Sequence, residues 1–159
     1  MPTPFEALAA IPNACQALPT VVTGGQPSAA DFERFAAAGG AIVLDTRDPR
    51  EPRPLDEAAT LQRLGLRYEI VAIGAGLLTD QTLERIREVL RTAGDRSVLF
   101  HCASGNRVGA ALVPYLVLDQ GMDEEDAVAQ ALRVGLRSPE LLEWAREYIR
   151  RRQDERMSG

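Results

Sequence analysis

The residues with the clearest chemical potential are a cysteine and an arginine that enclose a short loop of small residues. Cys102 follows an apolar run rich in β-forming residues, and Arg107 begins a helix-compatible segment after four intervening residues. A strand, a tight loop and a helix N-terminus direct backbone amides and the helix dipole at one point, which predicts an anion site. In that field the thiol should ionise below its ordinary pKa of about 8.5 and act as a nucleophile.

The loop residues are expected to hold the anion and the arginine to clamp it, because a guanidinium offers paired donors that lysine cannot match. The residues expected to surround the anion are Ala103, Ser104, Gly105, Asn106 and Val108. His101, the only histidine in the chain, is expected to brace the loop by hydrogen bonds rather than to act as a base. A buried structural thiol beside a surface arginine is the simpler alternative, but the preceding strand and the following helix favour the site.

Length, composition and charge indicate a single soluble domain. A chain of 159 residues can bury a core, and 45% hydrophobic with 26% charged residues is ordinary for a globular protein. A net charge of −5 predicts no nucleic-acid partner, and the absence of a long apolar run predicts no membrane span. Cys15 and Cys102 form no disulfide framework, which fits a cytoplasmic location where a free thiolate persists.

No cofactor or metal is expected, because one histidine and two distant cysteines do not supply a ligand set. The chain also lacks the glycine-rich patterns of nucleotide-binding proteins.

Segments of strand character alternate with segments of helix character, which predicts an α/β fold: a mostly parallel sheet of four or five strands flanked by helices. Strands are expected at 20–23, 41–44, 66–73 and 98–101, and helices at 28–38, 55–64, 79–94, 107–118, 123–134 and onward from 138. Pro114 should kink its helix. We expect an N-terminal arm at 1–19, a single catalytic domain at 20–152 and a C-terminal tail at 153–159.

Four residues outside the loop are candidates for a substrate-facing wall or a general acid. Asp45 ends a predicted strand at the sheet edge where α/β folds place their chemistry, and Arg47 and Asp48 follow it. Asp80 lies between the strand at 66–73 and the cysteine strand. Simpler explanations are preferred for the two possible acids: Asp80 as a first-turn helix charge and Asp48 as a solvated turn residue.

The segment that follows Asp45 is dense in charge and proline, and we expect it to be exposed and stiff. It is as compatible with a solvated loop as with a wall that faces the substrate. Its charged members are Arg47, Glu51, Arg53, Asp56 and Glu57.

Four separated motifs resemble the beta-lactamase-hydrolase-like, phosphatase-like family, a bacterial branch of the tyrosine-phosphatase-like superfamily. They are residues 23–28, 45–47, 65–68 and 101–107, which occur in order between about residues 10 and 150. The resemblance implies a tyrosine-phosphatase-like three-layer fold and a cysteine nucleophile.

Two departures from the phosphatase pattern favour a different reaction. The phosphatases of the superfamily have one residue more between cysteine and arginine, whereas the four residues between Cys102 and Arg107 are typical of rhodanese sulfurtransferases. A transferring phosphoryl group needs donors for three oxygens, whereas a persulfide fits a smaller cradle. Val108 occupies the place where the pattern usually has Ser or Thr. We therefore expect a rhodanese-type sulfurtransferase that carries sulfane sulfur on Cys102.

Two alternatives remain open at this point. The first is a phosphatase that hydrolyses phosphomonoesters through a cysteinyl-phosphate, and the second is a non-catalytic module that binds anions or proteins. The expected ligand is a small anion (thiosulfate, a persulfide or a phosphoester), with a thiol acceptor or redox partner if sulfur is transferred. Cys15 could resolve a persulfide on Cys102, although an inert thiol in the arm is the preferred interpretation.

Overall fold

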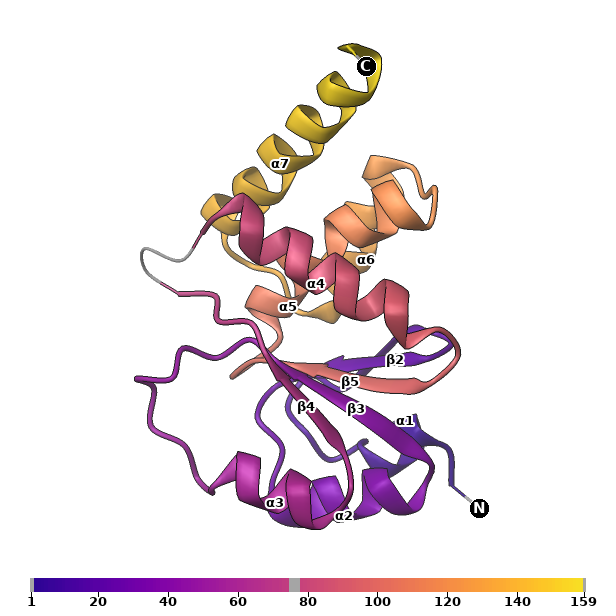
Figure 1. Ribbon diagram of the computed structural model, residues 1–159, viewed down its shortest axis with the longest axis vertical. Helices are drawn as coiled ribbons and strands as arrows, with labels where there is room; N and C mark the ends of the chain where they lie inside the picture. Colours follow the sequence, from indigo (N-terminus) through magenta and orange to yellow (C-terminus); the bar gives the residue numbers. More distant parts are fainter. Residues whose placement is uncertain (1, 75–77, 159) are drawn as a thin grey trace.

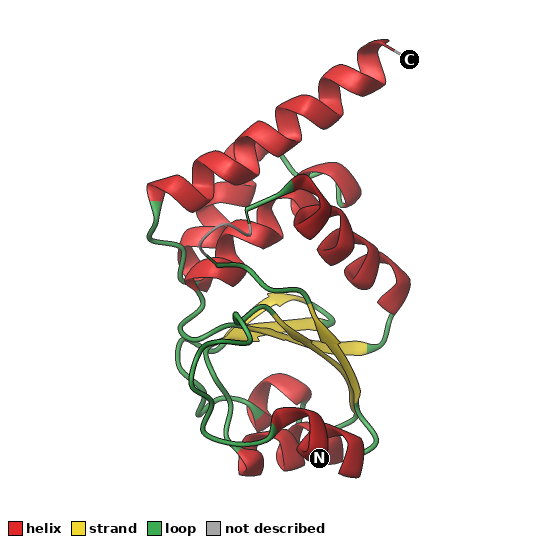
Figure 2. Ribbon diagram, turned by 60° about the vertical axis from the view of Figure 1, so that its left-hand side comes forward, coloured by secondary structure: helices red, strands yellow, loops and turns green. Residues whose placement is uncertain are grey.

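The computed structural model describes residues 2–74 and 78–158, which fold into three layers with a sheet in the middle (Figures 1 and 2). The strands are β1 (Cys15–Leu18), β2 (Val21–Gly24), β3 (Gly40–Asp45), β4 (Arg67–Ile70) and β5 (Ser97–His101). The helices are α1 (Pro4–Ala7), α2 (Ala29–Ala37), α3 (Glu57–Arg63), α4 (Asp80–Ala93), α5 (Asn106–Pro114), α6 (Glu124–Val134) and α7 (Pro139–Ser158), with a π-helical segment η1 (Tyr115–Asp119). Helices α1 to α3 lie on one side of the sheet and α4 to α7 lie on the other, with α7 packed on the outside of α4 and α5.

The strand order is β1-β2-β5-β3-β4, and every neighbouring pair is parallel except β1 with β2. This arrangement confirms the predicted α/β fold with a mostly parallel sheet. Strand β5 lies at the centre, where His101 is level with Gly24 of β2 and Asp45 of β3. The carboxyl ends of three strands therefore meet at one edge, and the residues that follow each strand are brought together there.

Alternating side chains of β5 supply both halves of the core. Val98, Phe100 and Cys102 pack into the cluster beneath α4 to α7, whereas Leu99 packs into the cluster beneath α2 and α3. All four side chains are buried, as period-two alternation requires in a strand covered on both faces.

Several elements differ from the sequence-based expectation. Residues 15–18 of the expected arm form β1, an antiparallel partner of β2, and 153–158 of the expected tail continue α7. The division into arm, domain and tail remains a prediction. Strand β4 is shorter than the predicted 66–73, because pairing with β3 ends at Ile70. Pro114 ends the regular α5, and the chain continues in the π-helical η1 rather than through a simple kink.

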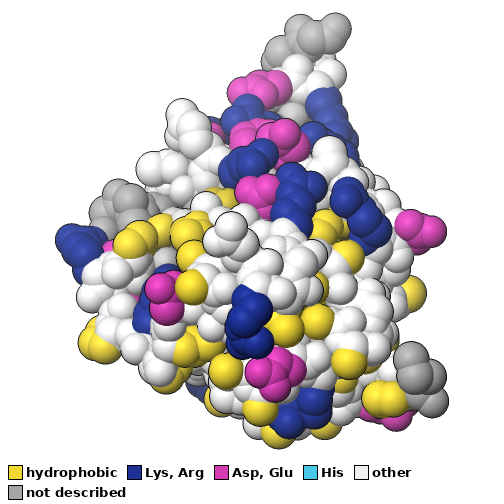
Figure 3. Space-filling model, turned by 60° about the horizontal axis from the view of Figure 1, so that its bottom comes forward, with side chains coloured by type: hydrophobic (Ala, Val, Ile, Leu, Met, Phe, Trp, Pro, Cys, Tyr) yellow, Lys and Arg dark blue, Asp and Glu magenta, His cyan; other side chains and the backbone are white. Residues whose placement is uncertain are grey.

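The surface carries closely mixed charge along the protruding C-terminal helix. Basic and acidic side chains alternate in the upper part of Figure 3, where α7 runs, and Arg150, Arg151 and Arg152 each pair with carboxylates. Among the described residues, none of the helices combines the length and the apolar character that crossing a bilayer requires.

Candidate active site

Cys102 lies directly after β5, at the N-terminal end of α5. Its side chain is completely buried, and the Gly105 amide donates a hydrogen bond to its Sγ at 3.0 Å. Gly105 has a φ of 96°, and a Cβ at this position would lie 2.7 Å from the Val134 carbonyl oxygen. The loop therefore requires glycine here both for its backbone conformation and for its approach to α6.

Contacts from outside the loop fix its conformation. The Ala103 carbonyl accepts a hydrogen bond from the Gln26 amide at 3.1 Å, and the Ser104 carbonyl accepts one from Asn13 Nδ2 at 2.6 Å. Gly25 also packs so closely that a Cβ on it would lie 2.3 Å from the Ala103 oxygen. The segment Gly24–Pro27, part of the first of the four sequence motifs, thus supports the Cys102–Arg107 loop.

Asn106 joins the loop to the start of α7. Its Oδ1 accepts hydrogen bonds from the Arg137 amide at 2.7 Å and from the Ser138 amide at 3.2 Å. Its side-chain oxygen is therefore bonded to the neighbouring segment, and its backbone amide lies at the N-terminus of α5. Val108 is likewise buried in the core, so its contribution to the predicted anion site is restricted to its backbone.

Arg107 is paired with a carboxylate from the charged loop that follows β3. Its Nη1 and Nη2 both donate to the carboxylate of Glu51, with Nη2 to Oε2 at 3.1 Å, and Nη1 also donates to the Ile73 carbonyl at 3.1 Å. The hydrogen bonds from Arg107 lower the pKa of Glu51 to about 2, against the opposing effect of burial. Arg47 and the Asp48 amide also bind Glu51, each at 3.1 Å.

His101 is fixed by a second carboxylate from the same loop region. Its Nε2 lies 2.7 Å from Oε2 of Glu57, the first residue of α3, and its Nδ1 lies 3.2 Å from the Cys102 carbonyl oxygen. Both ring nitrogens are thus engaged, and the bracing role of His101 stays a prediction. The sequence alone did not identify the partner, since Glu57 is 44 residues away in the chain.

Asp45 is buried at the centre of a polar cluster rather than facing a substrate. Its Oδ2 accepts hydrogen bonds from Arg53 Nη1 at 2.6 Å and from the Tyr68 hydroxyl at 2.5 Å. Burial, followed by the hydrogen bond to Asp45, raises the pKa of Tyr68 above its usual 10.0. Arg47 is also buried and binds Gln26 Oε1 at 2.6 Å and the Pro52 carbonyl at 2.8 Å. Both residues therefore hold the loop after β3 in place.

The cluster includes a set of atoms that resembles a metal-ligand group. Ligand atoms of Asp45, Glu57 and His101 lie within 4.8 Å of one another. Arg53 already donates to both carboxylates, at 2.6 Å to Asp45 and 3.5 Å to Glu57. A cation bound there would meet the guanidinium charge, so the set fits an ion-paired cluster better than a metal site.

Neither candidate acid is bonded to the catalytic loop. Asp48 is buried rather than solvated, and its hydrogen bonds with Arg50 lower its pKa to about 2, which leaves it ionised and a poor proton donor at neutral pH. Asp80 starts α4 and pairs with Arg151 at 2.6 Å and Arg152 at 3.7 Å, as a first-turn helix charge would. The loop between Ile70 and Asp80 contains no acidic residue.

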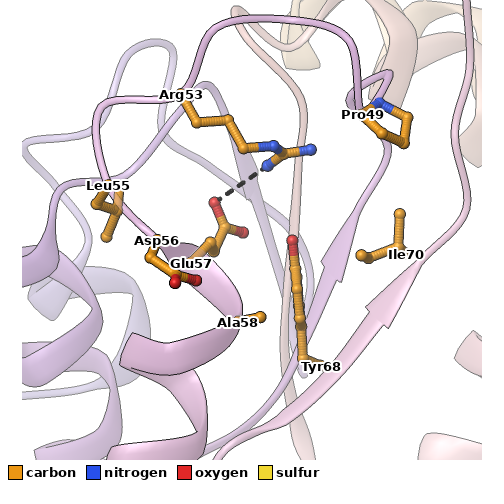
Figure 4. Close-up of a pocket in the computed structure, with 8 residues that line it drawn as sticks. All are labelled: Pro49, Arg53, Leu55, Asp56, Glu57, Ala58, Tyr68 and Ile70. Carbon is orange, nitrogen blue, oxygen red and sulfur yellow. Dashed lines mark hydrogen bonds and ion pairs between the residues drawn. The ribbon is translucent and has the colours of Figure 1, made fainter.

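Two pockets adjoin these groups. One of about 320 Å³ lies beside Arg107 and is bounded by the segment after β4 and by the start of α7. The other, of about 200 Å³, lies between the loop after β3, α3 and β4 (Figure 4). In that pocket Arg53 and Tyr68 converge near Glu57, so it opens onto the polar cluster rather than onto Cys102.

The structure has the tyrosine-phosphatase-like fold, with a cysteine at the carboxyl end of a central parallel strand. A DUF442 protein from Shewanella putrefaciens CN-32 has a TM-score of 0.75 and 19% identity, over 91% of this chain and 95% of that one. PTPMT1 gives a TM-score of 0.75 with 17% identity, over 92% and 99%. TpbA of P. aeruginosa gives 0.66 with 22% identity, over 87% and 83%.

Sequence comparison confirms the resemblance to the beta-lactamase-hydrolase-like, phosphatase-like family. Two proteins named beta-lactamase hydrolase-like protein, from Xylella fastidiosa strains Temecula1 and 9a5c, are each 30% identical over 113 residues. The match covers 67% of this chain and 26% of each relative, so the chain spans about a quarter of their length. No protein-family model matches the chain.

Proposed function

We propose that this protein is a cysteine-dependent phosphatase that hydrolyses phosphomonoesters through a cysteinyl-phosphate. The observation that carries the proposal is the position of Cys102, whose Sγ accepts the Gly105 amide at the N-terminus of α5 while Arg107 follows one residue into the helix. The amides, the helix dipole and the guanidinium are donors suited to a phosphoryl group. This function replaces sulfur transfer as the favoured one, because the structural neighbours include TpbA, crystallised with phosphotyrosine.

The reaction has two displacements at phosphorus. The Cys102 thiolate attacks phosphorus, the ester P–O bond breaks, and its electron pair leaves on the ester oxygen, which takes a proton from water. Water then attacks the cysteinyl-phosphate, the P–S bond breaks, and inorganic phosphate and the thiolate are released. Because neither Asp48 nor Asp80 contacts the catalytic loop, we expect turnover to depend strongly on a good leaving group, such as a phenolate.

Sulfur transfer is the second candidate, and it is favoured by the four-residue spacing of the loop. In that reaction the Cys102 thiolate attacks the outer sulfur of thiosulfate, the S–S bond breaks, and sulfite leaves with the electron pair. Cyanide then takes the sulfur from the persulfide as thiocyanate and restores the thiolate.

One parallel assay separates the two candidates. The protein is incubated with an aryl phosphate, and separately with thiosulfate followed by cyanide, and intact mass is measured for a phosphoryl or a sulfur adduct. Cys102→Ser should abolish the favoured reaction, because a hydroxyl is a far poorer nucleophile at neutral pH, whereas Cys15→Ser should retain it. Arg107→Ala should weaken use of the anionic substrate by about 1.5–3 kcal/mol for each charge-assisted hydrogen bond lost.

A sulfur adduct on Cys102 without aryl phosphate hydrolysis would replace the phosphatase proposal with sulfur transfer. Neither adduct, together with no turnover of either substrate, would favour the non-catalytic binding module.

A further inference from the structure

The pocket beside Arg107 has an apolar wall and a single carboxylate at its rim. Its lining residues are Ile73, Gly74, Leu78, Arg107, Glu140 and Leu141. At about 320 Å³ it lies at the small end of the range for small-molecule sites. Arg107 is the only cation among these lining residues, and its guanidinium is paired with Glu51, which does not line the pocket.

The helix start that carries Glu140 is bonded to the Cys102–Arg107 loop. Glu140 lies in the first turn of α7, and Asn106 of the loop accepts the Arg137 and Ser138 amides that precede this helix. Ser138 in turn caps the helix by accepting the Leu141 amide at 3.2 Å. The backbone that leads into the first turn of α7, where Glu140 lies, is therefore tied to the Cys102–Arg107 loop by direct hydrogen bonds.

Glu140 is exposed, and within residues 2–74 and 78–158 it forms no ion pair or hydrogen bond through its side chain. A first-turn acid can be explained by the helix dipole alone. That explanation does not account for the place of this acid on the pocket. The other described lining residues are Gly74, three apolar side chains and Arg107, the residue proposed to bind the anion. An unpaired carboxylate there repels a second negative charge on the ligand.

We propose that the substrate carries one anionic group on an uncharged, largely apolar body, and that Glu140 excludes substrates with a second negative charge. This inference rests on the proposed function, in that the anionic group is taken to be the phosphate attacked by Cys102. The apolar body then lies against Ile73, Leu78 and Leu141, with its far end near Glu140. Phosphoesters that bear further phosphates or carboxylates are predicted to be poor substrates.

The test compares two aryl phosphates of equal size at low ionic strength: 4-carbamoylphenyl phosphate, with a neutral substituent, and 4-carboxyphenyl phosphate, with an anionic one. The measured quantity is the ratio of their kcat/KM values, neutral over anionic. Glu140→Gln should lower this ratio about twofold to fivefold relative to the unmodified chain, and Glu140→Arg should lower it further. The two leaving groups differ in intrinsic reactivity. Comparing the kcat/KM ratio of a variant with that of the unmodified chain removes this difference, because it is the same for every protein.

Glu143→Gln is the matched control, because Glu143 is an exposed acid on the same helix that pairs with Arg150 and does not line the pocket. It should leave the ratio unchanged. The inference is overturned if Glu140→Gln has the same kcat/KM ratio as the unmodified chain. It is also overturned if Glu143→Gln changes the ratio as much as Glu140→Gln does.

A binding readout separates this inference from the proposed function. Protection of Cys102 from iodoacetamide by each aryl phosphate is measured in the same proteins. Selective protection that depends on Glu140, without any turnover, supports the inference and contradicts the phosphatase proposal. Turnover with a ratio that does not depend on Glu140 supports the phosphatase proposal and contradicts the inference.

Discussion

Two glutamates from one charged segment bind opposite ends of the catalytic loop, and their surroundings differ. Glu51 pairs with Arg107 at the end of the loop that faces the pocket, and 27% of its side chain is exposed. Glu57 binds His101 on the buried side, where only 2% of its side chain is exposed. The comparison teaches that residue type and proximity in sequence do not determine the surroundings of a carboxylate here, since one glutamate is partly exposed and the other is enclosed.

The difference follows from what would replace each carboxylate. A bound anion or water can take the place of Glu51 on Arg107, so the pair can open at modest cost. The Glu57 carboxylate is almost fully buried, and it also accepts hydrogen bonds from Gln26 Nε2 at 2.9 Å and Arg53 at 3.5 Å. Loss of Glu57 would leave buried donors without acceptors.

Glu57→Ala should therefore cause the largest loss of stability in this comparison. We expect the free energy of unfolding to fall by about 3–5 kcal/mol, the cost of removing one partner from a buried charged pair. Urea denaturation followed by circular dichroism measures it. Glu57→Gln should lose less, because an amide oxygen can still accept from His101 or Arg53, and Asp56→Ala, which removes only the N-cap of α3, should cost about 1 kcal/mol. A loss for Glu57→Ala no larger than for Asp56→Ala would contradict the assigned role.

The sequence predicted the catalytic loop and the fold because both depend on local patterns. The apolar run to Phe100, the glycine in the loop and the helix after Arg107 are adjacent in the chain, so their geometry follows from neighbouring residues. The partners of the loop could not be predicted in this way. Glu51 and Arg107 are 56 residues apart, and only the parallel pairing of β3 with β5 brings them together.

The segment after β3 shows the same limit. Its charge and proline predicted an exposed segment. Pro49, Arg50, Pro52 and Pro54 are exposed, but Thr46, Arg47 and Asp48 are buried. Arg47 can be buried because its donors bond to the carboxylates of Asp45 and Glu51 and to the Pro52 carbonyl. Charge density indicates that polar groups need partners. It does not indicate whether those partners are water or protein.

The Glu51 pair should contribute less to stability, and its contribution should depend on pH. Since Arg107 lowers the pKa of Glu51 from 4.5 to about 2, the pair stabilises the fold above about pH 4.5 and is lost as the pH falls toward 2. Glu51→Gln should cost about 1 kcal/mol at pH 7, given the partial exposure of the pair. The difference from the unmodified chain should shrink toward zero near pH 2, as measured by denaturation at both pH values. A difference that stays constant with pH would mean that the charge of Glu51 is not what stabilises the pair.

The smallest effect expected is on the affinity for an anion, and it tests whether Glu51 competes with the ligand for Arg107. Both terminal nitrogens of Arg107 donate to Glu51, so an incoming phosphate must share or displace those bonds. Replacement by Gln removes the competing negative charge, and inhibition by inorganic phosphate should become about threefold tighter in Glu51→Gln, a change of less than about 1 kcal/mol. Competitive inhibition of aryl phosphate hydrolysis measures it, with protection of Cys102 from iodoacetamide as a readout that needs no turnover.

The matched control is Glu33→Gln, because Glu33 is an exposed carboxylate that pairs with Arg63 away from the site, and it should leave the inhibition constant unchanged. Weaker inhibition in Glu51→Gln would instead show that the Glu51 carboxylate orients Arg107 for the anion. Glu51 and Glu57 would then both hold residues of the loop in position, and they would differ only in exposure.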